Sequence, residues 1–397
     1  MDIDDAMRTI GQRVRQIRYA RGKSLRVIAG LAGISTSHLS RIERGERALD
    51  SRSLIAALAH ALQIPPSELM KLPVPAPGNG HTDSSIEAVR LALMAVSHRL
   101  PGGQLASVQA LRARVETVLA AGRQCRQAEV GSLLPGLIRD LHTSIAAGRD
   151  LAELLDLAVM LHVQSAQHWL REVAAPLDLR RENVMLTRQV AEQRGTPTAL
   201  GLAAYGAMRV LLTAGALDLA KAELAAVDVP TTTPESTQLA GMLALSHSLV
   251  AAADSHPADV DAAVEYAGEL AQRTGEGTAY GLGFGPTNVV LWRMEAVLEI
   301  GDHERVIALA EGLNPEVHPY RSRRSAYWAD YGRALTRVRG RRKDAVMAFR
   351  RAETIHPHRV QRNPIVRDTL AELLARSRQD AVGRELRGMA YRAGLPV

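Results

Sequence analysis

The stretch GISTSHLSRIERGER, residues 33–47, sets a helical apolar pattern beside a dense group of polar side chains. Its large apolar residues, Ile34, Leu39 and Ile42, have the spacing of one face of a short helix. The positions between them carry hydroxyl, imidazole and guanidinium groups, in the order Thr36, Ser37, His38, Ser40 and Arg41. Short or forked hydrogen-bonding groups on the outward side of a helix are suited to reading the edges of nucleic-acid bases.

The surrounding residues predict a set of five short helices, the first over roughly residues 5–21. Glycines are placed to end the first three helices, and serines to cap the second and third: Gly22, Gly33, Gly45, Ser24 and Ser35. Two short helices joined by a tight glycine turn form a helix-turn-helix, whose second helix enters the major groove of DNA. In this geometry the polar side chains of residues 36–41 are expected to face the edges of the DNA bases.

Residues 8–70 resemble the lambda-repressor-like, Xre-type DNA-binding domain. The resemblance rests on SLRVIAGLAGISTSHLSRIERGER (residues 24–47) and on LAHALQIPPSEL (residues 58–69). It implies that Arg18 pairs with Glu43 to brace the first helix against the third. It also implies base contacts from Thr36, Ser37, Ser40 and Arg41, and phosphate contacts from Ser24, Arg26, Arg44 and Arg47. His38 stays open between a contact to base or phosphate and a plain surface position.

The composition favours helix along the whole chain. Of 397 residues, 46% are apolar, 23% charged and only 3% aromatic, as expected for a globular protein rich in Ala and Leu. There is no apolar run long enough for a membrane span, and the acidic N-terminus lacks the apolar core of a signal peptide. We therefore expect a cytoplasmic protein without membrane contact. The single Cys125 fits a reducing compartment, either as an inert buried thiol or as a redox-sensing one.

The segment LPVPAPGNGHTDSS, residues 72–85, predicts a linker after a DNA-binding domain at residues 1–71. Residues 86–397 predict helical hairpins that turn at Gly215, Gly301 and Gly340. The last hairpin carries most of a tetratricopeptide consensus, at Trp328, Tyr331, Gly332, Leu335, Ala345, Phe349, Ala352 and Pro357. Because the hairpin spacing is uneven, the expected all-α fold is a five-helix helix-turn-helix domain followed by an irregular α-solenoid.

Positive charge is concentrated in two zones of the chain. Residues 8–52 carry a surplus of +8 and residues 320–362 a surplus of +10, although the whole chain is only +7. Such zones indicate at least one surface for a polyanion, and nearly all of the cations are arginines, which suit phosphate and guanine. The second zone is either a solvated repeat surface or a further contact with flanking DNA or an anionic ligand.

The C-terminal hairpins also resemble the helical-repeat regions of bacterial regulators, among them receptors for signalling peptides. In such repeats the first helix of each pair lines a concave groove. That register places five side chains in the groove: Tyr205, Arg209, Asn288, Glu295 and Arg333. They can bind the backbone and termini of a short peptide, or a small molecule. The alternative is that they pair with one another across adjacent repeats.

The sequence shows no constellation typical of catalysis. The Gly-rich segment at residues 275–286 lacks the strand and the Gly-Lys-Ser/Thr ending of a phosphate loop, and no histidines have the spacing of zinc ligands. We expect no enzyme activity, cofactor or metal. The favoured hypothesis is a homodimeric transcription regulator on an inverted-repeat DNA site, controlled by a small ligand or peptide. The alternatives are a DNA-tethered scaffold for a partner protein and, third, a hydrolase with a DNA-binding head.

Overall fold

The N-terminal domain, residues 9–71, packs five helices around a small apolar core. This computed structural model describes residues 9–71, 80–377 and 379–397 of the chain. The five helices are α1 (Ile10–Ala20), α2 (Leu25–Leu31), α3 (Thr36–Glu43), α4 (Arg52–Leu62) and α5 (Pro66–Met70). Val14, Ile28, Leu39, Ile42 and Leu58 are fully buried between them. The apolar side chains that predicted the third helix therefore form part of this core.

Local signals in the sequence set the ends of these helices. The hydroxyl of Ser24 accepts a hydrogen bond from the Val27 amide, and that of Ser35 accepts one from the His38 amide at 3.1 Å. Gly33 and Gly45 have φ angles of 68° and 71°, in the left-handed region that favours glycine. The predicted caps and turns are confirmed. The first helix begins at Ile10, later than expected, and residues 1–8 lie outside the described residues.

The C-terminal region, residues 80–397, continues as helix after helix. Its first half contains α6 (Gly80–Ser97), α7 (Val108–Arg123), α8 (Gln127–Ala146), α9 (Leu151–Met160), the π-helical η1 (Leu161–Gln167), α10 (His168–Glu172), α11 (Leu177–Arg194), α12 (Pro197–Ala214) and α13 (Leu217–Ala225). Its second half contains α14 (Pro234–Ala253), α15 (Pro257–Thr274), η2 (Ala279–Gly281), α16 (Pro286–Ile300), α17 (His303–Glu311), η3 (Pro315–Val317), α18 (Arg321–Arg337), α19 (Arg342–Ile355), α20 (Pro357–Gln361), α21 (Pro364–Ala375) and α22 (Ala381–Arg392). The prediction of an all-α fold is confirmed.

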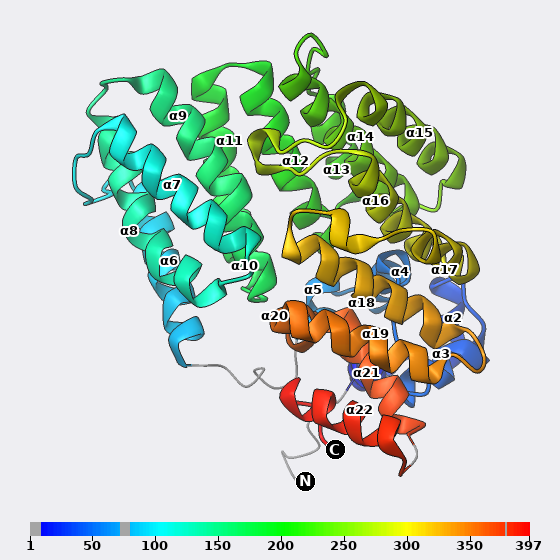
Figure 1. The fold of residues 1–397 in the computed structure, drawn as a ribbon. Helices are drawn as coiled ribbons and strands as arrows, with labels where there is room; N and C mark the ends of the chain where they lie inside the picture. The colour runs from blue at the N-terminus through cyan, green and yellow to red at the C-terminus, as the bar shows by residue number, and fades with distance from the viewer. Residues whose placement is uncertain (1–8, 72–79, 378) are drawn as a thin grey trace.

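Neighbouring helices pair as antiparallel hairpins, and the pairs follow one another along an arc (Figure 1). Gly215, Gly301 and Gly340 occupy the turns between α12 and α13, α16 and α17, and α18 and α19, as predicted. In the last of these hairpins a β-carbon on Gly332 would lie 3.1 Å from the Phe349 ring, so glycine permits the close approach of α18 and α19. Because Gly332 has no side chain, the Phe349 ring can fill the interface between the two helices.

Helix α6 begins at Gly80, so the last six residues of the expected 72–85 linker belong to a helix. Residues 72–79 of that segment lie outside the described residues. Among the helices that the structure describes, none is both long enough and apolar enough to cross a membrane.

The chain returns on itself, because the N-terminal domain packs beside the C-terminal helices rather than apart from them. In Figure 1 α4 and α5 lie next to α18, at the far end of the arc from α9. Ile365 of α21 joins the apolar core of the N-terminal domain, and α5 contacts α12. The face of the domain that contains α4 and α5 is therefore covered by the C-terminal region.

Candidate nucleic-acid interface and the contact between the domains

Helix α3 is held rigidly from its buried side. Leu39 and Ile42 are fully buried, and a β-carbon on Gly11 of α1 would overlap the carbonyl oxygen of Ile42. The two helices cross this closely only because residue 11 has no side chain. The position of α3 is thus fixed against α1 at the level of the backbone.

A buried ion pair adds a second brace. Arg18 donates from Nε to Glu43 Oε1 at 2.6 Å and from Nη2 to Glu43 Oε2 at 2.7 Å, with both side chains almost fully buried. Such a forked pair fixes orientation as well as distance. The prediction that Arg18 and Glu43 connect the first and third helices is confirmed.

The outward side of α3 is open to solvent. Thr36, Ser37 and Arg41 are exposed, while His38 and Ser40 are half-buried. Burial lowers the pKa of His38, and the nearby cations of Arg47 and Arg41 lower it further, so the ring is neutral at neutral pH. A neutral imidazole has one donor and one acceptor to offer to a ligand.

The residues expected at phosphates differ in their surroundings. Ser24 and Arg26 are exposed at the start of α2. Arg44 is exposed but pairs with Glu46 at 2.6 Å and donates to Ser40, so it must exchange partners to meet a phosphate. Arg47 is half-buried, and burial together with the nearby Arg337 lowers its pKa.

Carboxylates of the C-terminal region bind backbone amides of the N-terminal domain. Asp368 of α21 accepts from the amides of Ile10 at 2.8 Å and Leu49 at 2.7 Å. Glu372, one turn later, accepts from the Ala48 amide at 2.8 Å. Backbone N–H groups at helix starts and in turns are natural anion sites, so these carboxylates satisfy donors that would otherwise lack partners.

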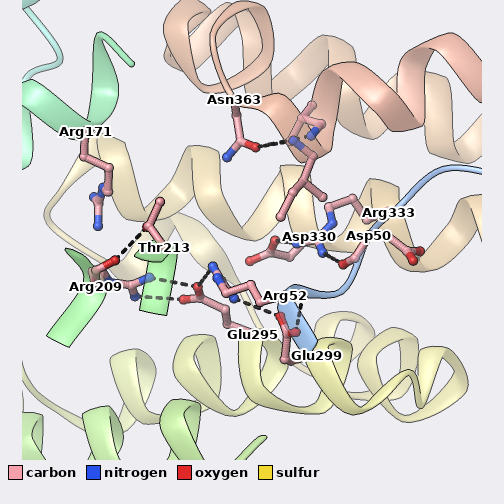
Figure 2. A network of polar contacts seen from close by, with 12 residues as sticks. Asp50, Arg52, Arg171, Arg209, Thr213, Glu295, Glu299, Asp330, Arg333 and Asn363 are labelled. Atoms are coloured by element: carbon pink, nitrogen blue, oxygen red, sulfur yellow. Dashed lines mark hydrogen bonds and ion pairs between the residues drawn. The ribbon is translucent and has the colours of Figure 1, made fainter. Parts of the chain in front are cut away.

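The start of α4 is held in the same way. Glu299 of α16 accepts hydrogen bonds from the amides of Arg52 and Ser53, in the position where a helix N-terminus favours negative charge. Figure 2 shows the Arg52 side chain between Glu299 and Glu295, which it meets at 3.0 Å each. The first residue of α4 is thus bound both through its backbone and through its side chain.

Two arginines of α18 hold the turn between α3 and α4. Arg333 donates to the Asp50 carbonyl oxygen at 2.5 Å (Figure 2), and Arg337 donates to the Asp50 carboxylate at 2.7 Å. Both belong to the basic zone at residues 320–362, so part of that surplus faces the N-terminal domain. Burial favours the neutral form of Asp50, but Arg337 and Arg333 outweigh it and lower its pKa.

The five side chains expected in a ligand groove occupy three kinds of position. Arg209 and Glu295 form a forked ion pair at 2.9 Å, which Arg52 joins, and Arg333 binds Asp50 and Asp330. Tyr205 packs near Trp292, with ring centroids 6.5 Å apart. Asn288 is fully buried and donates to the Met242 sulfur at 3.4 Å, so it faces the layer between α16 and α14.

A cavity of about 1000 Å³ lies between the N-terminal domain and the C-terminal region. Arg52 and Ala56 of α4 and Pro66 of α5 form one wall, while Arg209 of α12 and Arg333 of α18 contribute to the other. Within the described residues, no group of three His, Cys, Asp or Glu side chains is arranged to hold a metal ion. The charged side chains in this lining suit recognition of a charged molecule.

Sequence reasoning missed the carboxylates that join the two parts of the chain. Asp368, Glu372 and Glu299 stand in amphipathic helices, where acidic residues ordinarily face solvent. Their partners are 246 to 358 residues away in the chain, and no local pattern records such pairings. The apolar Ile365, three positions before Asp368, was one signal that this part of α21 is covered.

The comparisons with known proteins agree with this geometry. Residues 9–72 match the family model described as a helix-turn-helix domain. Residues 9–71, as the structure describes them, form a helix-turn-helix domain. The chain is 33% identical over 86 residues to the uncharacterized HTH-type transcriptional regulator RghRB of Bacillus subtilis (strain 168), covering 22% of this chain and 58% of that protein. It is 36% identical over 64 residues to the HTH-type transcriptional repressor RghR of the same organism, covering 16% of this chain and 47% of that protein.

The family model thus covers residues 9–72 of the chain, and each relative matches less than a quarter of it. The chain spans about half the length of these two relatives. No solved structure is significantly similar to the chain. The contact between the helix-turn-helix domain and the C-terminal region therefore comes from the structure alone.

Proposed function

We propose that this protein is a sequence-specific DNA-binding transcription regulator. The observation that carries the proposal is the way in which α3 is held in place and exposed to solvent. It is capped by Ser35, braced through Arg18 and Glu43, and leaves Thr36, Ser37 and Arg41 exposed. A rigid helix with exposed hydroxyl and guanidinium groups near its N-terminus has the properties that major-groove reading requires. The similarity to two HTH-type transcriptional regulators supports the same function.

The contact with the C-terminal region is compatible with this role. It uses α4, α5 and the turn before α4, with Asp50 and Arg52 at its centre. Arg41 and Arg26 stay exposed in this arrangement. The helix-turn-helix domain therefore leaves the outward residues of α3 exposed while α4, α5 and the turn after α3 are bound.

The protein acts as a homodimer in this proposal. One α3 helix reads only a few base pairs, too few for a unique site in a genome. Two copies related by a two-fold axis read an inverted repeat with half-sites about one helical turn apart, or a multiple of it.

A small effector controls the affinity for DNA in this proposal. A ligand shifts an equilibrium between two domain arrangements only if it binds one of them better. The position of the cavity supports this proposal, because Ala56 and Pro66 on one wall and Arg209 on the other belong to different parts of the chain. A molecule bound there contacts both parts at once.

The test is a selection of full-length protein on random duplex DNA, followed by sequencing. We expect enrichment of an inverted repeat, and a complex with the selected duplex that contains two protein chains. The control is Arg149→Gln, because Arg149 is exposed and lies in the C-terminal region. It should select the same sequence. A selection that enriches no sequence would contradict the proposed function, and one that enriches a single unsymmetrical half-site would contradict the dimer.

A further inference from the structure

The cavity between the helix-turn-helix domain and the C-terminal region carries an excess of positive charge. Five guanidiniums that line it influence one another electrostatically, and two carboxylates, Glu172 and Glu295, form ion pairs with members of this group. A third carboxylate near them, Asp330, pairs instead with Arg333. The five belong to Arg171, Arg180, Arg209, Arg323 and Arg359. Like charges gathered in a partly enclosed space repel one another strongly, because less water screens them than at an open surface. The cluster therefore lacks counter-charge.

Arginines of the cluster already form ion pairs with both of these carboxylates, Glu172 and Glu295. Arg171 and Arg359 share Glu172, each at 2.9 Å, and Arg209 takes both oxygens of Glu295. In Figure 2 Arg171 reaches from its own helix toward the wall that carries Arg209 and Thr213. Both acidic side chains are already bound by arginine, so they leave no full charge for the remaining guanidiniums.

Arg180 and Arg323 are the two guanidiniums without a carboxylate. In the part of the chain that the structure describes, neither forms an ion pair, and Arg323 instead stacks on Trp292 with its centre 5.2 Å from the ring. Arg180 is only 8% exposed, and its buried Nε has no hydrogen-bond partner. A buried charge without a partner is strongly unfavourable. Burial and the nearby Arg171 lower the pKa of Arg180 to about 10, which reflects this cost.

We propose that this cavity binds a small polyanion, a molecule with at least two phosphate or carboxylate groups, through Arg180 and Arg323. Each guanidinium offers a planar pair of donors that matches an oxyanion, and two separate cations require two anionic groups. A volume of about 1000 Å³ is enough for a ligand of nucleotide size. The lining of the cavity thus indicates the chemical class of the effector. Only the effect of its binding on the affinity for DNA rests on the proposed function.

The polyanion contacts both parts of the chain. Arg13 and Lys71 of the helix-turn-helix domain line the same cavity, where Lys71 pairs with Glu68 and Arg13 adds a further cation. Arg41 does not line the cavity and stays exposed. A bound polyanion therefore draws the two walls together without covering α3.

The test is calorimetric titration of the full chain, without DNA, at constant ionic strength. The probes are tripolyphosphate and citrate, which separate phosphate from carboxylate ligands. We expect one site per chain for at least one probe, and a loss of affinity of tenfold or more in Arg180→Gln. Arg149→Gln is the matched control, because it removes an exposed arginine far from the cavity lining, and it should bind as the wild type does.

Thermal unfolding separates a ligand site from a purely structural cluster. Removing an unpaired buried charge should leave the melting temperature of ligand-free Arg180→Gln unchanged or raised, while the rise that the probe causes in the wild type disappears. Arg323→Gln serves as a second variant with the same expectation for binding. Absence of binding of both probes to the wild type, or equal binding by both variants, would overturn the proposal. Since no DNA is present, neither outcome depends on the proposed regulator function.

Discussion

Arg337 of α18 holds Asp50 of the helix-turn-helix domain, with Nη2 2.6 Å from Oδ2, although the two residues are 287 positions apart. The same guanidinium donates to Glu372 at 2.5 Å, and its side chain is only 2% exposed. One buried cation thus pairs with a carboxylate on each side of the contact. The docked arrangement depends on this residue more than on any exposed ion pair, since exposed pairs contribute little.

Arg337→Met should destabilise the docked arrangement strongly. It leaves Asp50 and Glu372 buried without their shared cation, and breaking such a pair costs about 3–5 kcal/mol. The measurement is amide hydrogen exchange, in which the Ala48 and Leu49 amides should lose protection. Arg112→Met is the control, because its ion pair with Glu153 is exposed on both sides, and it should change little. Unchanged protection in Arg337→Met would show that the contact does not depend on this charge.

Two glycines of the helix-turn-helix domain should respond to alanine with opposite signs. Gly11→Ala places a β-carbon on the Ile42 carbonyl oxygen and forces α1 away from α3, at a cost of about 1–3 kcal/mol or more. Gly30→Ala in α2 meets nothing within 4 Å and should stabilise by about 0.5–1 kcal/mol. Urea unfolding of both variants measures the free energies. Equal effects of the two substitutions would contradict the close packing of α1 on α3.

Asp368 should make the docked arrangement sensitive to pH. Burial raises the pKa of Asp368 to about 7. The hydrogen bonds from the Leu49 and Ile10 amides act in the opposite direction, while the charges of Asp50 and Glu372 add to the rise. The folded protein then holds a proton that the unfolded chain releases near pH 3.8. The contribution of this proton to the free energy of unfolding is fully present below that pH. It is lost as the pH rises toward about 7, by about 1.4 kcal/mol per pKa unit.

The comparison of wild type with Asp368→Asn isolates this titration from that of the buried histidines. The variant loses one amide contact at every pH but has no carboxyl group to titrate. We expect the stability of the wild type relative to the variant to fall between pH 5 and 7 and to level off above pH 8. A difference that stays constant over this range would contradict the raised pKa.

The sequence was sufficient for the helix-turn-helix domain because its signals are local. Ser35 caps the helix that begins at the next residue, and Gly45 ends the same helix, so each effect acts over a few positions. The pairing of Arg18 with Glu43 required the family resemblance, because nothing in the spacing alone selects that partner. The hairpin turns at Gly215 and Gly301 were predictable for the same local reason.

The contact between the domains was not predictable from the sequence. The expected ligand groove therefore did not include the N-terminal domain, which binds some of its residues. A repeat register assumes equal hairpins, whereas a glycine-rich loop separates α16 from the preceding hairpin of α14 and α15, and Asn288 faces α14. Glu295 was expected either to meet a ligand or to pair with another groove residue; it pairs with Arg209, and it also binds Arg52 of the N-terminal domain. A side chain that faces a groove is available to a ligand only if no other part of the chain fills that groove.

The reading of DNA by α3 is tested most directly by Arg41→Ala, compared with Arg26→Ala on the same duplexes. Both arginines are exposed, but Arg41 lies on α3 and Arg26 at the start of α2. We expect Arg41→Ala to lose about 1–3 kcal/mol on the selected duplex and almost nothing on a scrambled one. Arg26→Ala should weaken both duplexes similarly and reduce the salt dependence of binding. Equal losses on selected and scrambled DNA for Arg41→Ala would contradict the account.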